Sequence, residues 1–147
     1  MKKLLFTALF AVTIAVSAFA TDADKVSAAA YNNFKATFRR AGDVSWTISK
    51  DYTTATFLYN NIRTQALYTP EGEFIGTNTA VAIEDLPLKA KRTFAKKYDG
   101  YTVKEAIRFE GNEEGAFFIA AENEKEAVVL KVTDYGQVSV VKYSEKK

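Results

Sequence analysis

The stretch TTATFLYNNIRTQALY, residues 53–68, places two runs of strand-forming residues on either side of Asn60 and Asn61. Threonine, aromatic and aliphatic residues dominate both runs, and residues of these types favour strands. Polar residues such as asparagine favour turns. The stretch therefore predicts two antiparallel strands, residues 53–59 and 62–68, joined by a polar turn.

Helix-like periodicity occurs once before these strands and once after them. Apolar residues four positions apart lie on one face of a helix. In the first segment, residues 24–40, this set comprises Val26, Ala30, Phe34 and Phe38. In the second segment, which begins near Asp85 and ends at Gly100, the set comprises Leu86, Ala90, Phe94 and Tyr98. Two helices are therefore expected.

Alternating sequence follows each predicted helix, and such alternation is typical of half-buried strands. One face is predicted to carry Val44, Trp46 and Ile48 after the first helix, and Tyr101, Val103, Ile107 and Phe109 after the second. Further strands are expected at residues 73–77, 115–121, 126–133 and 137–143. Trp46 is expected to face the helices.

Two four-residue turns occupy matching places in the two halves of the chain, residues 69–72 and 133–136. Each ends in glycine, which adopts a positive φ without strain. The turns and the order of elements indicate a duplication. Strand runs separated by single helices favour an α+β fold with antiparallel pairing. We therefore predict two tandem helix-then-antiparallel-strands repeats, about residues 24–80 and 84–145, with both helices on one face of a shared sheet.

Two segments resemble PepSY-like periplasmic proteins. Residues 85–101, DLPLKAKRTFAKKYDGY, resemble the family's LP-x-x-x-K-x-x-F-x-x-K-Y-P-G-Y helix, with Asp99 where the family often has proline. Residues 34–46, FKATFRRAGDVSW, resemble the F-x-x-x-F-P-x-A-x-x-V-x-W motif of its first repeat. The resemblance implies one domain over residues 21–147 and a curved sheet similar to that of β-lactamase-inhibitor protein (BLIP). It also implies a role in binding or restraining peptidases.

The first 20 residues have the three-part layout of a secretory signal peptide. Lys2 and Lys3 precede an uncharged run that extends to Thr21, and Ala18-Phe19-Ala20 supplies the cleavage site. The alternative is an uncleaved membrane anchor, because the run is close to the length that spans a bilayer. Cleavage after Ala20 predicts a periplasmic or secreted protein. A lipid anchor after the signal is excluded, because the chain has no cysteine.

The composition excludes several kinds of chemistry. With neither His nor Cys, the chain has no histidine-based catalytic triad, no Cys–His pair and no site that binds a metal through His or Cys. Removal of the signal leaves 18 basic and 18 acidic residues, and a neutral chain has no long-range attraction to nucleic acid or to an anionic membrane. We therefore predict a protein that is not an enzyme, with no catalytic residue, metal or cofactor. The remaining enzymatic alternative is a carboxylate pair in the predicted turns, either Glu113 with Glu114 or a pair among Glu122, Glu124 and Glu126.

A sheet that helices cover on one side leaves its other face open. In the predicted alternation Leu58 and Phe118 point away from the helices, with Lys104 and Arg108 around them. Apolar groups rimmed by polar groups are common at protein-binding surfaces. These four residues are the predicted contacts of a binding or inhibitory module with a protein partner in the cell envelope. Ordinary scatter of surface apolar residues is the alternative interpretation. The alternative function is a carrier or sensor that holds a small ligand or peptide between helices and sheet.

The second predicted helix carries a cluster of positive charges, which comprises Lys89, Lys91, Arg92, Lys96 and Lys97. Such a cluster indicates either the solvent face of an amphipathic helix or a surface for an anion or acidic partner. From the sequence, the solvent-face interpretation is preferred.

Overall fold

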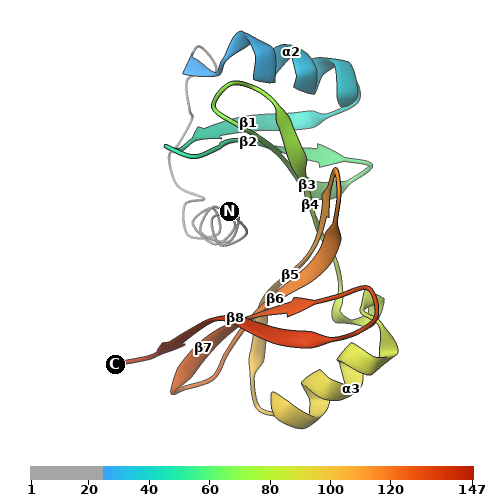
Figure 1. The fold of residues 1–147 in the computed structure, drawn as a ribbon, viewed down its shortest axis with the longest axis vertical. Coiled ribbons are helices and arrows are strands. Elements are labelled where there is room, and N and C mark those ends of the chain that lie inside the picture. Colours follow the sequence, from blue (N-terminus) through green and yellow to red (C-terminus); the bar gives the residue numbers. More distant parts are fainter. Residues whose placement is uncertain (1–24) are drawn as a thin grey trace. The chain divides into compact units, whose positions relative to one another are not determined.

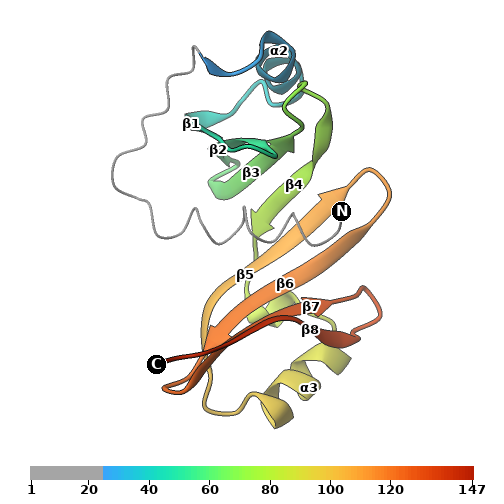
Figure 2. The ribbon, with the colours of Figure 1, turned by 60° about the vertical axis from the view of Figure 1, so that its left-hand side comes forward.

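The computed structural model describes residues 25–147 (Figures 1 and 2). The predicted signal peptide lies outside the described residues. The N-terminal elements are α2 (Ala28–Thr37), β1 (Gly42–Ile48), β2 (Thr53–Tyr59), β3 (Ile62–Tyr68) and β4 (Phe74–Ala80). They are followed by the 3₁₀ turn η2 (Ile83–Asp85), α3 (Leu88–Lys97), β5 (Thr102–Gly111), β6 (Gly115–Glu122), β7 (Glu126–Val132) and β8 (Val138–Glu145). Within residues 25–147, no helix is long and apolar enough to span a membrane.

The eight strands belong to one sheet, in which each strand is hydrogen-bonded to its neighbours in the sequence, in the order β1 to β8. The predicted α+β fold of two tandem helix-then-antiparallel-strands repeats on a shared curved sheet is therefore wrong. The described residues form a β-rich fold, a single eight-stranded antiparallel sheet with two ten-residue helices.

The sequence prediction overestimated the helices and underestimated the strands that connect the two halves. Four-residue apolar spacing continued beyond the ends of α2, so that a helix over residues 24–40 was expected where ten residues are helical. Conversely, β4 extends to Ala80, and the amide of Val81 then donates to the carbonyl of Ala106 at 3.0 Å. The sheet thus continues through the segment that was taken as the boundary between repeats.

The described chain divides into two compact units, the first ending at Gly76 and the second beginning at Thr77. In the N-terminal unit, α2 packs on β1–β3 through aromatic side chains. The ring of Phe34 lies edge-on to Trp46 at 5.2 Å and to Phe57 at 5.0 Å between centroids. Ser27 caps this helix, because its hydroxyl oxygen accepts from the amide of Ala30 at 3.2 Å. The predicted helix-facing orientation of Trp46 is confirmed.

In the C-terminal unit, α3 packs on β5–β7 through aliphatic side chains. The buried residues of this cluster are Leu86, Ala90, Ala106, Ile119, Ala121, Val128, Leu130 and Val132. Phe94 and Tyr98 are partly buried against it. The two predicted apolar helix faces are therefore confirmed, because the members of each set lie in the core of their own unit.

The two predicted glycine turns are also confirmed. Gly72 has a φ of +95° and Gly136 a φ of +82°. The amide of each glycine donates to the carbonyl of the threonine three residues earlier, at 2.9 Å in both turns. The residue at the fourth position of each turn has a left-handed backbone conformation with positive φ, which glycine adopts without strain.

A β-bulge in β5 overturns one predicted strand face. Val103 pairs with Ala121, but the next aligned residue, Glu105, pairs with Ala120. One extra residue in a strand reverses the direction of every side chain that follows it. Val103 therefore packs on the α3 cluster, whereas Ile107 pairs with Phe118 on the other side of the sheet. The prediction that Val103, Ile107 and Phe109 share one face is wrong.

Burial of Tyr68 predicts a loss of stability at alkaline pH. Its side chain is fully buried in the N-terminal core, and burial raises the pKa of its hydroxyl from the usual 10.0 to about 12. Between these two values the hydroxyl ionises in the unfolded chain but not in the folded one. The free energy of unfolding therefore falls as pH rises from about 10 to about 12.

The substitution Tyr68→Phe is expected to remove this part of the alkaline destabilisation. The measurement is urea unfolding of wild type and variant at pH 7, 10 and 11. At pH 11 the free energy of unfolding of Tyr68→Phe, relative to that of wild type, should be higher than it is at pH 7. An unchanged difference across these pH values would show that the Tyr68 hydroxyl ionises equally in both states.

Candidate functional site

Phe118 lies on the side of the sheet away from α3, as predicted, but it is not an exposed side chain. Its neighbours in β6, Phe117 and Ile119, belong to the α3 cluster. Phe118 pairs with Ile107 in β5 and with Lys131 in β7. Only 9% of its surface is exposed. We therefore do not place Phe118 in a contact surface.

Leu58 is exposed and belongs to the N-terminal unit. It alternates with Phe57, which is buried under α2, and 40% of its surface is exposed. Leu58 pairs with Arg63 across the β2–β3 hairpin. The other three predicted contacts belong to the C-terminal unit, so the four do not form one surface within either unit.

Arg108 lies on the α3 side of the sheet, opposite to Phe118, because of the bulge in β5. Its guanidinium carbon is 4.7 Å from the centroid of the Phe117 ring. Its Nε donates to Oε1 of Glu110 at 2.9 Å, and its Nη1 donates to Oδ1 of Asp134. The hydrogen bond to Asp134 raises the pKa of Arg108 and lowers that of Asp134. Arg108 thus ties β5 to the turn between β7 and β8.

Lys104 occupies the bulge and is already paired with a carboxylate. Its Nζ lies 3.0 Å from Oε1 of Glu122, and Nζ of Lys146 lies 3.0 Å from the other oxygen, Oε2. Hydrogen bonds from Lys146 and then Lys104 lower the pKa of Glu122. This three-residue network fixes the chain beyond β8 against the end of β6.

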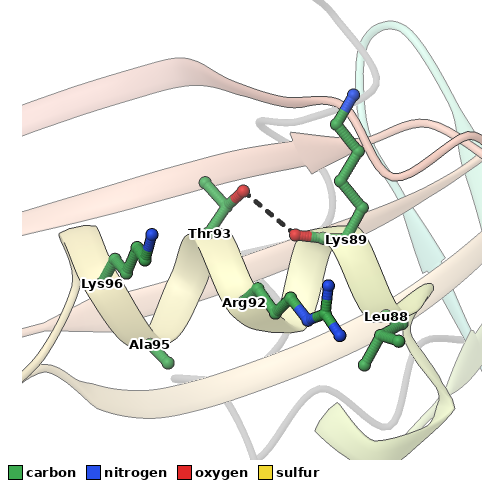
Figure 3. Close-up of a pocket in the computed structure, with 6 residues that line it drawn as sticks. All are labelled: Leu88, Lys89, Arg92, Thr93, Ala95 and Lys96. Atoms are coloured by element: carbon green, nitrogen blue, oxygen red, sulfur yellow. Dashed lines mark hydrogen bonds between the residues drawn. The ribbon is translucent and has the colours of Figure 1, made fainter.

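The outer face of α3 carries a groove of about 580 Å³ (Figure 3). Its lining comprises Leu88, Lys89, Arg92, Thr93, Ala95 and Lys96, all from this one helix. The hydroxyl of Thr93 donates to the carbonyl of Lys89 at 3.0 Å. Leu88 and Ala95 are the apolar residues of the lining, and Lys89, Arg92 and Lys96 are its cations, which makes the groove suited to a ligand with both apolar and acidic groups.

The cations of α3 are not neutralised by other described residues. Lys89, Arg92, Lys96 and Lys97 form no ion pair with another residue of the described range 25–147. Lys91 donates to the backbone carbonyl of Glu84 at 3.2 Å. The sequence revealed this charge cluster, but it did not reveal that the charges are unpaired.

Tyr135, which the sequence analysis missed, lies in a turn that contacts the beginning of α3. A Cβ atom built on Gly136 would lie 2.9 Å from Cβ of Lys89 and 3.4 Å from Cβ of Pro87. Tyr135 is 87% exposed and Leu88 is 59% exposed. In Figures 1 and 2 this red turn lies beside α3. We call these side chains together the α3 surface, which comprises Leu88, Lys89, Arg92, Lys96 and Tyr135.

A metal centre and a groove beside α2 are the other candidate sites in the described residues. In residues 25–147, no group of three or more acidic side chains is placed to hold a metal ion. A second groove, of about 330 Å³, lies between α2 and β1 and is lined by Phe34, Lys35, Phe38, Arg39, Ala41 and Val44. The interior between α2 and the sheet is filled by aromatic rings, so this groove is confined to the end of the helix.

Comparison with solved structures shows the fold. A protein of Bacteroides eggerthii, provisionally described as periplasmic, superposes with a TM-score of 0.71 at 19% identity. The match covers 82% of this chain and 88% of that one. A DUF2874 family protein of Bacteroides uniformis gives a TM-score of 0.70 at 16% identity over 81% of this chain and 88% of that one.

A BLIP-like protein of Bacteroides fragilis gives a TM-score of 0.65 at 19% identity, over 81% of this chain and 85% of that one. The expected similarity to the BLIP fold is therefore confirmed. The expected periplasmic or secreted location agrees with the description of the Bacteroides eggerthii protein. No protein-family model matches the chain, and no curated protein sequence matches it.

Proposed function

We propose that this chain is a periplasmic protein-binding module and that the α3 surface contacts its partner. The observation that carries the proposal is the exposure of Tyr135 and Leu88 beside unpaired cations in one region of the C-terminal unit. Tyrosine and arginine are enriched among the residues that contribute most to protein–protein binding, and apolar anchors ringed by polar groups are typical of interfaces. The BLIP-like fold of the structural neighbours supports the same class of function.

Membership of the PepSY-like group and inhibition of a peptidase are the finer parts of this proposal. Both are supported by the resemblance of residues 34–46 and 85–101 to that family. The second of these segments contains all of α3. The α3-surface residues of this helix, Leu88, Lys89, Arg92 and Lys96, stand at positions that the family motif leaves open. Inhibition would follow if the partner's active site lay beneath the bound module.

A protein partner fits the α3 surface better than a small ligand does. Small-molecule sites are concave and enclose most of the ligand surface. The groove on α3 is lined by one helix only and is open to solvent along its length. Leu88 and Tyr135 are exposed apolar side chains on two different elements, and a protein partner can contact both at once.

Site-specific photo-crosslinking in the producing cell tests the proposal. A photoreactive phenylalanine derivative replaces Leu88, Tyr135 or, as a control, Glu113, an exposed residue in the turn between β5 and β6. We expect an adduct of the same mass from positions 88 and 135 and none from position 113. No adduct at 88 and 135, or equal adducts at all three positions, would refute the α3 surface as the contact.

A further inference from the structure

The first turn of α3 has a charge distribution that opposes its own helix dipole. The N-terminus of a helix carries a partial positive charge, which carboxylates stabilise and cations destabilise. The first turn of α3 contains no acidic residue, and Pro87 at the N-cap makes no side-chain hydrogen bond. Lys89 is the second helical residue. The first turn and the N-cap therefore supply neither usual source of stabilisation, and the first turn carries a repulsive charge as well.

Helix α2 of the same chain has a favourable arrangement at both ends, whereas α3 has one only in its last turn, which contains Lys96 and Lys97. Its N-cap Ser27 accepts a hydrogen bond from Ala30, and its only cation, Lys35, lies in the last turn, where the dipole favours positive charge. The charge pattern of α3 is therefore not a general feature of the helices in this protein.

Like charges also face one another along the outer side of α3. Lys89 and Arg92 are three residues apart, and Arg92 and Lys96 are four apart, so that each pair lies on one face of the helix. Like-charge pairs at these spacings destabilise a helix, and no carboxylate in residues 25–147 pairs with these three side chains. A partner that supplies negative charge would relieve the repulsion.

The dimensions of the cationic stripe favour a short acidic segment over an extended anionic surface. From Lys89 to Lys96 the helix rises about 10 Å. Exposed carboxylates border the stripe, Glu84 and Asp85 before α3 and Asp99 after it. These acids would repel an anionic bilayer or a nucleic acid that extended beyond the stripe, whereas a segment of a few residues fits between them.

We propose that the outer face of α3 binds an acidic polypeptide segment of the partner through Lys89, Arg92 and Lys96, with Leu88 as the apolar contact. This inference rests on the proposed protein-binding function and specifies the chemistry of the bound segment. The unpaired cations lower the stability of the helix in the free protein, and the bound acidic segment offsets this loss. The positive charge of Arg92 therefore lowers the stability of the free protein and strengthens binding of the acidic segment.

The substitution Arg92→Glu tests both effects in one protein. It replaces two repulsive pairs by attractive pairs with Lys89 and Lys96, so the thermal midpoint of the free protein should rise. The affinity for a fluorescent synthetic peptide of alternating Glu and Leu should fall roughly tenfold or more, because an attractive contact becomes repulsive. Binding of this peptide to wild type should weaken as salt increases from 50 to 500 mM.

Lys125→Glu is the matched control, because Lys125 is exposed in the same unit, lies outside α3 and gives the same change in net charge. It should leave the peptide affinity unchanged within about twofold. The proposal is overturned if Arg92→Glu lowers the thermal midpoint, or if both variants weaken peptide binding equally. It is also overturned if wild type binds phosphatidylglycerol vesicles but not the peptide. Crosslinks from positions 88 and 135 without peptide binding would overturn the acidic segment and leave the protein-binding function standing.

Discussion

Replacing Phe34 by alanine is expected to lower the free energy of unfolding by about 3–5 kcal/mol. Phe34 is 2% exposed and lies at the centre of the N-terminal core. Its ring contacts Trp46, Phe57 and Phe38 with centroid distances of 5.2, 5.0 and 5.5 Å. The substitution removes the ring and leaves a cavity that α2 and a three-stranded ladder cannot fill without moving backbone.

Urea unfolding followed by circular dichroism measures this effect, with Lys35→Ala as the control on the exposed side of the same helix. Lys35→Ala should change the free energy of unfolding by about 0.5 kcal/mol or less. A loss below about 1 kcal/mol for Phe34→Ala would show that Phe34 is not at the centre of a close-packed core.

Replacing Gly72 by alanine is expected to destabilise the protein by about 2–4 kcal/mol, because two separate penalties add. The first is the φ of +95°, which an L-residue adopts only with strain. The second is steric. A Cβ atom at this position would lie 2.6 Å from Cβ of Ala29 and 2.6 Å from the amide nitrogen of Ala30, both in the first turn of α2.

Gly100→Ala separates the two penalties. Gly100 has a φ of +84°, but no atom lies within 4 Å of a Cβ built on it. This variant should therefore lose only about 1 kcal/mol, the cost of the backbone conformation. Gly136, in the same unit as Gly100, has a similar φ and an intermediate clash, 2.9 Å to Cβ of Lys89. The loss of stability in Gly136→Ala should lie between those of the other two variants. Equal losses of stability in all three variants would contradict the steric argument.

The strands and turns could be predicted because they depend on local sequence. The Asn60-Asn61 turn requires two residues with positive φ, and asparagine tolerates that region; the observed φ values are 52° and 63°. Residues 53–59 and 62–68 consequently form β2 and β3 with the predicted bounds. The glycine turns at Gly72 and Gly136 could be identified for the same reason.

The faces of β5 could not be predicted because a bulge has no fixed sequence signature. One extra residue at Lys104 turned Arg108 to the α3 side and left Ile107 opposite Phe118. The predicted surface therefore combined residues from both faces of one strand. The extension of β4 from residue 77 to Ala80 was missed for a related reason, since pairing between distant strands is set by tertiary contacts.

The candidate site was predictable in its charges but not in its composition. Periodicity showed that Lys89, Arg92 and Lys96 lie on the exposed side of a helix. It could not show that no described carboxylate reaches them, or that the turn carrying Tyr135 packs against Lys89. Both facts depend on how residues more than 40 positions apart are arranged in space. This arrangement determines whether the cations of α3 form a solvated helix face or part of a binding surface.

The most direct test of the proposed binding function is the yield of crosslinked adduct from position 135 in three backgrounds: wild type, Arg92→Glu and Lys125→Glu. Residue 135 reports contact with the partner, whereas residue 92 supplies charge from the neighbouring helix. We predict one adduct that persists in Lys125→Glu and is lost in Arg92→Glu. An absent adduct, or an adduct of equal yield in all three backgrounds, would contradict binding of a protein partner through the α3 surface.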